Sequence, residues 1–288
     1  MKILVTVKQV PDTSGKVAVN PDGTLDRASM QTIINPDDLN AVEAALSLKD
    51  QLGCKVIAFT MGPPPAEGML RELMAMGVDE GVLITAREFG GSDTYATSQI
   101  IAAGIDTYGV EEDDIILAGR QAIDGDTAQV GPQVAEKLNW PQVTYAEEIV
   151  GIEGDELLIR RRLEHGVETV ACRLPLVMTV NGTAPECRPR HAKLVMKYKH
   201  AITPSECQLD HVGCYAQLRE SRPYLNITEW GVADVDADDT QLGLSGSPTK
   251  VKKIENVVFA AKEAKRLSAD DADIDSLIKE LIASHTLG

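Results

Sequence analysis

The sequence predicts an α/β protein with a mostly parallel sheet and helices on both of its faces. Short apolar runs alternate with segments of helical periodicity through the first two-thirds of the 288 residues, an order that is typical of parallel sheets. Hydrophobic residues make up 43% of the chain and charged residues 25%, as in ordinary soluble globular proteins. A chain of this length is long enough for one or two domains with a sizeable core.

Each element of this alternation has its own signal. Buried strands are expected at the apolar runs, which cover residues 3–7, 55–60, 81–85 and 114–118. A helix is expected after each run, and each opens on residues that are typical of a helix start. These openings are Asn35-Pro36-Asp37-Asp38, Pro63-Pro64-Pro65, Ser92 or Asp93, and the region from about Thr127.

The pattern changes in the middle of the chain. Residues 156–162 and 167–173 alternate between apolar and polar side chains around the turn Glu164-His165-Gly166, which predicts an antiparallel hairpin added on the C-terminal side. One more apolar strand is expected at residues 176–180.

The rest of the chain has weaker periodicity. Residues 181–200 are rich in Pro, Arg, Lys and His and are typical of an exposed loop, and residues 234–239 are typical of an acidic linker. A tail helix with one apolar face is expected over residues 273–284. We therefore expect an α/β domain at 1–200, which includes the hairpin and the loop, and a linker with an extended C-terminal arm at 201–288.

The composition argues against several classes of function. A formal net charge of −16 and an aromatic content of 4% disfavour binding to nucleic acid or to anionic lipid. No apolar run is long enough for membrane insertion, and residues 1–8 are typical of a strand rather than of a signal peptide. Five cysteines without a framework spacing favour reduced thiols and a cytoplasmic protein.

A metal site is not expected. Cys207, His211 and Cys214 form a C-x3-H-x2-C pattern, but this spacing is not one of the usual zinc-binding patterns. Unpaired thiols are the simpler interpretation, so no metal ligand is assigned.

The loop at residues 119–132, Gly-Arg-Gln-Ala-Ile-Asp-Gly-Asp-Thr-Ala-Gln-Val-Gly-Pro, carries the most chemical information. It follows a predicted buried strand and precedes a predicted helix, and its glycines allow the backbone to approach an anion closely. The free amides of a first helical turn, with the helix dipole behind them, bind phosphate. We therefore expect the amides of residues 127–130 to hold the phosphates of a nucleotide, with the Thr127 hydroxyl as a further donor.

Alternatives at this loop stay open. A plain capping turn without a ligand also explains it, because strand–loop–helix units are common. Asp124 and Asp126 would repel a phosphate, so they are assigned to helix caps or to ribose hydroxyls. The chain has neither the G-x-G-x-x-G motif nor a Walker A motif, so any nucleotide is held by a different kind of loop.

Further candidates lie where other predicted strands end, since α/β folds bind ligands there. Thr6 and Lys8 end the first strand, and Met61 and Gly62 end the second. Lys8 is equally well explained as a solvated strand end, and Met61 as a core residue.

The turn that opens the first helix is a candidate of the same kind. Asn35 and Asp38 are suited to capping that helix. The adenine or ribose of a nucleotide would pack against the same turn, so both roles are compatible.

Several blocks of sequence occur in an order that is informative as a whole. The blocks are Val7-Lys8-Gln9-Val10-Pro11-Asp12, Asn35-Pro36-Asp37-Asp38 with Ala41-Val42-Glu43-Ala44-Ala45, Met61-Gly62-Pro63 with Met74-Ala75-Met76-Gly77-Val78-Asp79, Gly119-Arg120-Gln121-Ala122-Ile123-Asp124, Trp140-Pro141-Gln142, and Leu174-Pro175. Spread over the first two hundred residues, they resemble the beta subunit of electron-transfer flavoproteins.

The resemblance implies pairing with an alpha subunit that carries the redox-active flavin. In the common form of the family the beta subunit holds a structural AMP, and in the electron-bifurcating form it holds FAD and oxidises NADH. Residues 89–98, Phe-Gly-Gly-Ser-Asp-Thr-Tyr-Ala-Thr-Ser, and residues 124–132 look like the bifurcating form. The resemblance therefore favours FAD, with AMP as the alternative.

The implied function is electron transfer. With FAD bound, the subunit would take a hydride from NADH, and the electrons would divide between the alpha-subunit flavin, which feeds an acyl-CoA dehydrogenase-like flavoenzyme, and a ferredoxin or flavodoxin. The flavin supplies that chemistry, so no side chain is assigned as catalytic. The residues assigned to the cofactor are Thr6, Lys8, Asn35, Asp38, Met61, Gly62, Gly90, Gly91, Thr94, Thr97, Gly119, Gln121, Ala122, Asp124, Gly125, Asp126, Thr127, Ala128, Gln129, Val130, Gly131 and Pro132.

Partner binding is expected at two places. Within the basic segment 185–200, the resemblance implies a recognition loop with Leu194 as apolar anchor and Arg190 and Lys193 beside it, although a solvated loop explains the charges too. The tail helix is implied to dock on the alpha subunit, the alternative being that it folds back on its own domain. A function from another class, a nucleotide-binding sensor without a redox role, also fits the residues.

Overall fold

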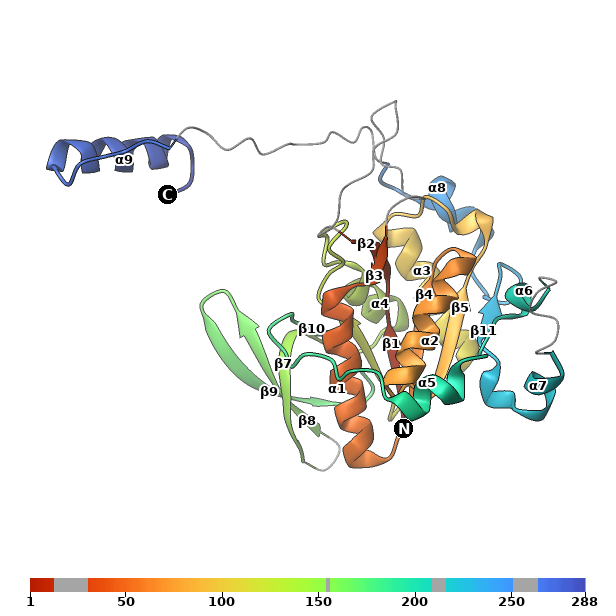
Figure 1. The fold of residues 1–288 in the computed structure, drawn as a ribbon. Helices are drawn as coiled ribbons and strands as arrows, with labels where there is room; N and C mark the ends of the chain where they lie inside the picture. The colour runs from red at the N-terminus through yellow and green to blue at the C-terminus, as the bar shows by residue number, and fades with distance from the viewer. Residues whose placement is uncertain (13–30, 154–155, 209–215, 251–263, 288) are drawn as a thin grey trace. The chain divides into compact units, whose positions relative to one another are not determined.

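The computed structural model describes residues 1–12, 31–153, 156–208, 216–250 and 264–287. It divides into two compact units, Met1–Lys252 and Lys253–Gly288. Within the described part of the first unit, nine strands form one sheet (Figure 1). In spatial order they are β11 (Thr228–Trp230), β5 (Glu80–Ile84), β4 (Lys55–Met61), β1 (Lys2–Thr6), β6 (Ile115–Gly119), β10 (Leu176–Val180), β7 (Gln142–Glu153), β8 (Glu156–Leu163) and β9 (Gly166–Arg173).

The sheet is parallel from β11 to β7, and β8 and β9 continue it in antiparallel pairing. Strand β1 lies in its centre, where Ile3 and Val5 face one apolar cluster and Leu4 faces the other. A strand that is buried on both faces needs apolar residues without alternation. This requirement explains why the central strands read as continuous apolar runs.

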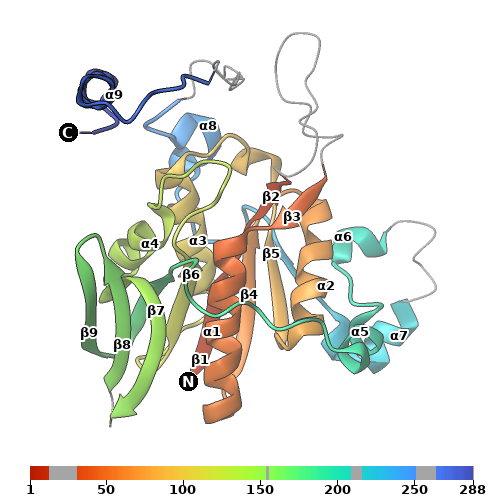
Figure 2. The same ribbon diagram turned by 60° about the vertical axis from the view of Figure 1, so that its left-hand side comes forward.

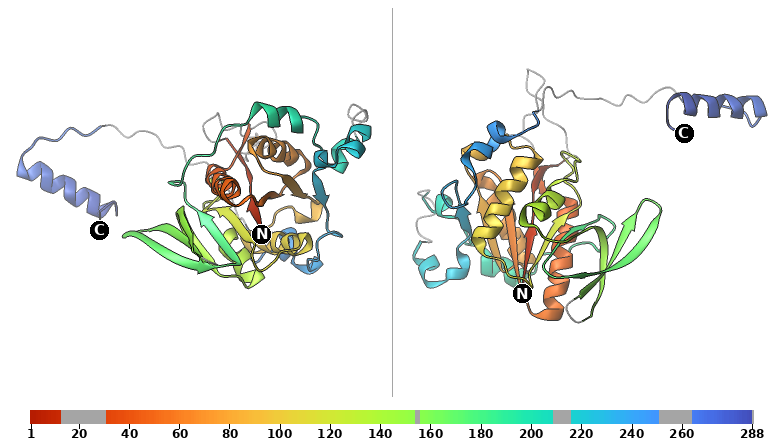
Figure 3. Two further views of the ribbon diagram at one scale, coloured as in Figure 1. Left: turned by 90° about the horizontal axis from the view of Figure 1, so that it is seen from below. Right: turned by 180° about the vertical axis from the view of Figure 1, so that it is seen from behind.

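Two pairs of helices cover the sheet. Helices α1 (Pro36–Leu52) and α2 (Glu67–Met76) lie on one face, and α3 (Thr94–Tyr108) and α4 (Val130–Leu138) lie on the other. The view from behind in Figure 3 shows α3 and α4 in front of the strands. Both faces of the sheet are therefore covered by helices, as expected for a doubly wound sheet.

The strand order places a topological switch between β1 and β6. From β1 the chain adds β4 and then β5 on one side, and it then crosses over to add β6 on the other side. At such a point the connections leave the sheet in opposite directions and open a crevice at the carboxyl ends of the strands. The strand order therefore predicts a ligand crevice between the segments that follow β1 and β6.

Shorter elements complete the structure. Strands β2 (Gln9–Pro11) and β3 (Thr32–Ile34) form a separate antiparallel pair. The remaining helical elements are η1 (Pro64–Ala66), η2 (Arg87–Phe89), α5 (Ala192–Tyr198), α6 (Pro204–Cys207), α7 (Ala216–Ser221), η4 (Pro223–Leu225), η5 (Asp239–Gln241), α8 (Gly243–Gly246) and α9 (Asp271–Ala283).

After β10 the chain crosses the outer surface of α1 on its way to α5 (Figure 2). The Asn40 side chain donates hydrogen bonds to the carbonyls of Ala184 and Pro185, at 2.9 and 2.8 Å. Arg188 pairs with Glu43 at 2.8 Å and with Asp50 at the same distance. The crossing segment is thus held by polar side chains of α1.

The predicted fold class is confirmed, as are the strands and the hairpin, which is β8 and β9. The exposed loop expected at 181–200 is wrong in part, because its second half forms α5, whose Tyr198 is buried. The first unit extends beyond the boundary expected at residue 200, since β11 pairs with β5. Residues 234–239 also belong to this unit, and Val235 lies in its core.

The second unit contains the expected tail helix, α9. Four of its large apolar side chains are exposed within that unit, namely Ile274, Leu277, Ile278 and Ile282. No helix among the described residues of either unit has the length and apolar character that crossing a membrane requires.

The bonds of Asn40 generate a prediction for stability. We expect Asn40→Ala to lower the free energy of unfolding by about 1–3 kcal/mol, because the buried carbonyl of Ala184 and the partly buried carbonyl of Pro185 lose their donor. Urea denaturation followed by circular dichroism measures the change. Asn226→Ala is the control: its side chain is exposed and also donates to a backbone carbonyl, Pro223 O, so a loss as large as that of Asn40→Ala would contradict the explanation.

Candidate functional site

The structure brings most of the predicted cofactor residues to one edge of the sheet. They follow the carboxyl ends of β1, β4, β5 and β6, which are parallel strands that lie side by side. Thr6 is opposite Ala118 in the β1–β6 register, and Met61 is opposite Ile84 in the β4–β5 register. This edge is the one at which the strand order predicts a ligand crevice.

The loop between β6 and α4 presents a run of free amides. The backbone N–H groups of residues 127–131 have no acceptor among the described residues. Two non-glycine residues of the loop, Asp126 and Ala128, have φ values of +50° and +52°. Left-handed residues next to right-handed ones turn successive amides into one concavity that suits an anion, and such backbone strain is concentrated at functional sites.

The helix itself begins later than expected. Gln129 is the N-cap and Val130 the first helical residue, so the prediction of a helix start near Thr127 is wrong by three residues. Pro132 lies in the first turn and has no N–H to offer. The first turn of α4 contributes the amides of Val130 and Gly131, and the other free amides belong to the strained loop before it.

The acidic residues of this loop already have partners. Lys8 Nζ lies 2.7 Å from Asp124, and the Gln121 side chain donates to Asp126 at 2.8 Å. The expectation that these carboxylates cap a helix is therefore wrong. Their pairing reduces the repulsion that an anion would meet at the neighbouring amides.

The start of α1 differs from the start of α4. Asp37 and Asp38 lie in the first turn of α1, whereas no acidic residue lies in the first turn of α4. Asp37 pairs with Arg120 at 3.2 Å. The positive end of the α1 dipole is thus satisfied by the chain's own carboxylates, and α4 offers the better site for an external anion.

Asp38 is buried and joins three elements. Its carboxylate accepts hydrogen bonds from the amide of Lys8, at 2.8 Å, and from the amide of Gly119, at 3.1 Å. A Cβ at position 119 would lie 2.3 Å from Asp38 Oδ1, so glycine is required there. Burial raises the pKa of Asp38 to about 7, against the lowering effect of these hydrogen bonds.

Asn35 is fully buried and holds the loop rather than the helix. Its side chain donates to the carbonyl of Gln121 at 2.8 Å and accepts from the amide of Ile123 at 3.1 Å. Asn35 occupies the N-cap position of α1, as expected, and its carbonyl accepts from the amide of Leu39, but its side chain makes no capping bond there. Asn35 and Asp38 use their polar atoms to fix the loop.

Helices α3 and α4 are linked at their starts. The Thr94 hydroxyl donates to Gln129 Oε1 at 2.9 Å, and Ser98 donates to Gln133 at 3.2 Å. Gly90 and Gly91 immediately precede α3. The two segments that were singled out from the sequence as separate features, residues 89–98 and 124–132, therefore form one surface.

Other predicted residues are placed by packing. Thr6 donates to Leu117 O at 3.4 Å, the Gly62 amide donates to Ile84 O, and Met61 packs against the core. Gly131 is buried, and a Cβ there would lie 2.7 Å from the Thr179 methyl group. The remaining predicted residues, Ala122, Gly125 and Thr97, lie in the loop and the first turn of α3 with their side chains at least partly exposed.

One segment at this edge is not predicted from the sequence. Residues 243–249, which we call the strap, contact the turn before α3: Leu244 N donates to Gly90 O at 3.2 Å, and Thr249 donates to Asp93. The signal that was available is the turn composition Gly-Leu-Ser-Gly-Ser-Pro-Thr, which follows the acidic stretch.

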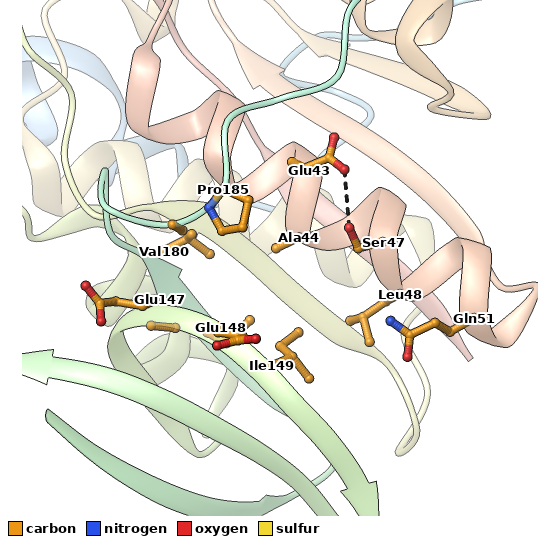
Figure 4. A pocket seen from close by; sticks show the side chains of 13 residues that line it. Glu43, Ala44, Ser47, Leu48, Gln51, Glu147, Glu148, Ile149, Val180 and Pro185 are labelled. Atoms are coloured by element: carbon orange, nitrogen blue, oxygen red, sulfur yellow. Dashed lines mark hydrogen bonds between the residues drawn. The ribbon is translucent and has the colours of Figure 1, made fainter.

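Two hollows lie elsewhere on the first unit. One, of about 210 Å³, lies between α1 and the strands β7 and β10, with Ala44, Leu48 and Ile149 on its walls (Figure 4). The other, of about 470 Å³, lies beside α5 and includes Leu194. Neither is lined by a residue that was assigned to the cofactor.

The expected recognition residues lie on or beside α5. Leu194 is half-buried against the core, and the exposed apolar side chains of this helix are Val195 and Met196. Lys193 is exposed, and Arg190 lies 3.7 Å from Glu72. The structure therefore presents Val195 and Met196 more openly than the anchor chosen from the sequence.

The cysteines are free where they are described: Cys54, Cys172, Cys187 and Cys207. No group of three metal-ligating side chains occurs among the described residues. His211 and Cys214, which were considered as metal ligands, lie outside those residues.

Comparison with known proteins identifies the family. The pattern of the "Electron transfer flavoprotein domain" matches residues 22–202. The acryloyl-CoA reductase electron transfer subunit gamma of Anaerotignum propionicum is 48% identical, over the whole of both chains. The chain belongs to the electron transfer flavoprotein family.

Within this family the chain is similar to beta subunits. The electron transfer flavoprotein subunit beta of Clostridium acetobutylicum is 43% identical, over 98% of this chain and 95% of its own. Subunit CarD of the caffeyl-CoA reductase-Etf complex of Acetobacterium woodii is 44% identical, over 87% and 86%. The resemblance that the ordered blocks indicated is confirmed.

The close contact at Gly131 generates a second prediction. We expect Gly131→Ala to lower the free energy of unfolding by about 1–3 kcal/mol, because the new methyl group would collide with that of Thr179. Adding Thr179→Ser, which removes the opposing methyl group, should recover most of the loss. Gly125→Ala is the control, since a Cβ there meets nothing within 4 Å; equal effects at both glycines would rule out the steric explanation.

The raised pKa of Asp38 generates a third prediction, which concerns the pH dependence of stability. A carboxyl group whose pKa is higher in the folded than in the unfolded chain stabilises the fold at low pH, and this contribution is lost as pH rises through its folded pKa of about 7. Relative to Asp38→Asn, the free energy of unfolding of the wild type should fall between pH 5 and pH 7, by up to about 1.4 kcal/mol per pH unit, and level off above pH 7.

Denaturation series at several pH values measure this difference. Asp113→Asn is the control, because a hydrogen bond from the N-terminal amine lowers the pKa of Asp113, so its difference from the wild type should be flat over the same range. A flat or rising difference for Asp38→Asn would contradict the prediction.

Proposed function

We propose that this chain is the FAD-binding beta subunit of an electron transfer flavoprotein, with the diphosphate of the cofactor at the amides of residues 127–131. The free amides, which come together in a strained loop at the topological switch, carry this proposal. A backbone run of this kind binds phosphate oxygens without a positively charged side chain.

The chain's own residues would position the cofactor. Asn35 and Asp38 fix the loop from behind, and Thr94 with Gln129 sets the distance between the starts of α3 and α4. Lys8 would balance the charge of Asp124 next to the phosphates. Open space at Gly125, where a Cβ would meet nothing, leaves room for the cofactor to extend along the loop.

The residues present suit a nucleotide, and the family suggests which redox chemistry it serves. When bound, FAD would supply hydride acceptance from NADH and the release of electrons to two acceptors, a ferredoxin or flavodoxin and the flavin of an alpha subunit. Two relatives carry the names of acryloyl-CoA and caffeyl-CoA reductase systems. We therefore propose an acyl-CoA dehydrogenase-type flavoenzyme as the second partner, in the cytoplasm.

Two surfaces would serve these partners. The exposed apolar face of α9 is suited to docking on an alpha subunit, since isolated helices with such a face are stabilised by packing. On α5, Leu194 with its neighbours Arg190 and Lys193 would contact the dehydrogenase, and the exposure of Met196 adds apolar area there.

The nucleotide content of the purified protein tests the cofactor. We expect two FAD molecules per complex when the chain is co-purified with its alpha subunit, as measured by acid extraction and chromatography. One FAD and one AMP would instead support a carrier with a structural nucleotide. A complex without any nucleotide beyond the alpha-subunit flavin would overturn the proposal.

A charge placed in the loop tests the position of the phosphates. We expect Thr127→Glu to weaken nucleotide binding about tenfold or more, because a carboxylate would compete with the phosphates for the same amides. Thr127→Gln is the control, since it has nearly the same size without charge and should stay within about twofold of the wild type. Equal binding by both variants would place the phosphates elsewhere.

A further inference from the structure

The strap, residues 243–249, is bound to the turn before α3 by its backbone. Gly243 has a φ of +56°, and a Cβ there would lie 2.1 Å from Glu88 O and 3.0 Å from Gly90 O. Only glycine allows this approach. Leu244 covers Gly91, where a Cβ would lie 3.2 Å from the Leu244 Cβ.

Side chains add a second set of bonds between the same two segments. The amide of Asp93 donates to Ser247 Oγ at 2.8 Å, and this buried hydroxyl donates to Gly243 O at 2.7 Å. The amide and the hydroxyl of Thr249 both donate to Asp93 Oδ2, at 2.9 and 2.6 Å. The strap therefore ends on a charged hydrogen bond, which is among the stronger kinds.

Asp93 connects the strap to the first turn of α3. Its Oδ1 accepts from the amide of Ala96 and caps that helix, while its Oδ2 holds Thr249. Burial acts to raise the pKa of Asp93, but the hydrogen bonds from Thr249 and Ala96 outweigh it and hold this pKa below the usual value. The carboxylate thus stays charged and serves both segments at neutral pH.

The contacts continue from α3 to the free amides. Thr94, the residue after Asp93, donates to Gln129, and Gln129 is the N-cap of α4. Each step between Thr249 and the loop at 127–131 is therefore a hydrogen bond or a covalent neighbour. Packing of a linker alone would need only the buried Leu242. Beyond it, Gly243, Leu244, Ser247 and Thr249 all contact the turn before α3.

We propose that the strap is a positioning element of the nucleotide site, and that the hydrogen bonds from Thr249 to Asp93 hold it in place. This inference rests on the proposed function. The strap sets the position of the turn that includes Gly90 and Gly91, and through Thr94 it sets the spacing between the starts of α3 and α4. Releasing it lets that spacing widen, so the site loses affinity while the core of the sheet stays intact.

Single substitutions at Thr249 test the inference in the full chain, co-purified with its alpha subunit and stripped of nucleotide. FAD and AMP are each titrated in, and amide hydrogen exchange of residues 90–97 is followed in the same samples. We expect Thr249→Val to bind about three- to tenfold more weakly and to exchange faster at those residues. Thr249→Ser, which keeps the hydroxyl, should restore both values.

The chain offers a matched control. The amide and hydroxyl of Thr240 donate to Asp238 Oδ1 at 2.9 and 2.6 Å, the same pair of donors as at Thr249, but Asp238 bonds to Thr240 and Gln241 rather than to the turn before α3. Thr240→Val should therefore leave binding and exchange unchanged. An equal loss of affinity in both valine variants would overturn the inference, because it would show a general effect of removing a hydroxyl.

The outcomes separate the two proposals. If the wild type binds FAD or AMP and Thr249→Val binds equally well, the role of the strap is refuted and the proposed function stands. If the wild type binds neither, the proposed function fails and the strap has no site to position. Weaker binding together with an unchanged melting temperature supports the positioning role over a merely structural one.

Discussion

The carboxylate of Asp38 is the contact on which the site depends. It lies where strands β1 and β6 end, and it binds an amide from each, Lys8 and Gly119. In a sheet with this strand order, that point is where the connections part and a crevice opens. One buried side chain from the start of α1 therefore joins the two walls of the crevice, and the absence of a side chain at Gly119 makes room for it.

The position of this carboxylate also explains why the starts of α1 and α4 differ in their capacity to bind an external anion. An α/β sheet offers several helix N-termini at the same edge, and each attracts negative charge. Here the start of α1 is satisfied internally by Asp37 and Asp38, whereas α4 starts without an acidic residue and follows a strained loop of free amides. The chain thus leaves one such position open to an external anion.

Much of this arrangement could be predicted from the sequence, because it rests on local patterns. The apolar runs located the central strands, and the loop at 119–132 was recognised as the segment richest in chemistry. The roles of individual side chains were less accessible. Asn35 has the sequence signature of a cap, yet its partners are Gln121 and Ile123, far along the chain, and no local pattern encodes a contact of that range.

The same reasoning accounts for the segments that were misjudged. The sequence places the start of α4 too early because Ala128, directly before the N-cap Gln129, is not of the type that signals a left-handed backbone. The sequence predicts a linker where the strap and β11 lie, because these short segments carry no periodicity and are stabilised by contacts with η2 and β5. Contacts between distant segments decide such regions, and a single sequence does not display them.

The central position of β1 has a consequence for biosynthesis. Ile3 is made long before one of its two neighbours in the sheet, Ile115, and the edge strand β11 joins Val82 only from Thr228. A nascent chain emerges with its N-terminus first, and pairing between distant segments is slow. The edge of the sheet that carries the site therefore stays incomplete for much of translation. Asp93 can bind Thr249 only after residue 249 has left the ribosome.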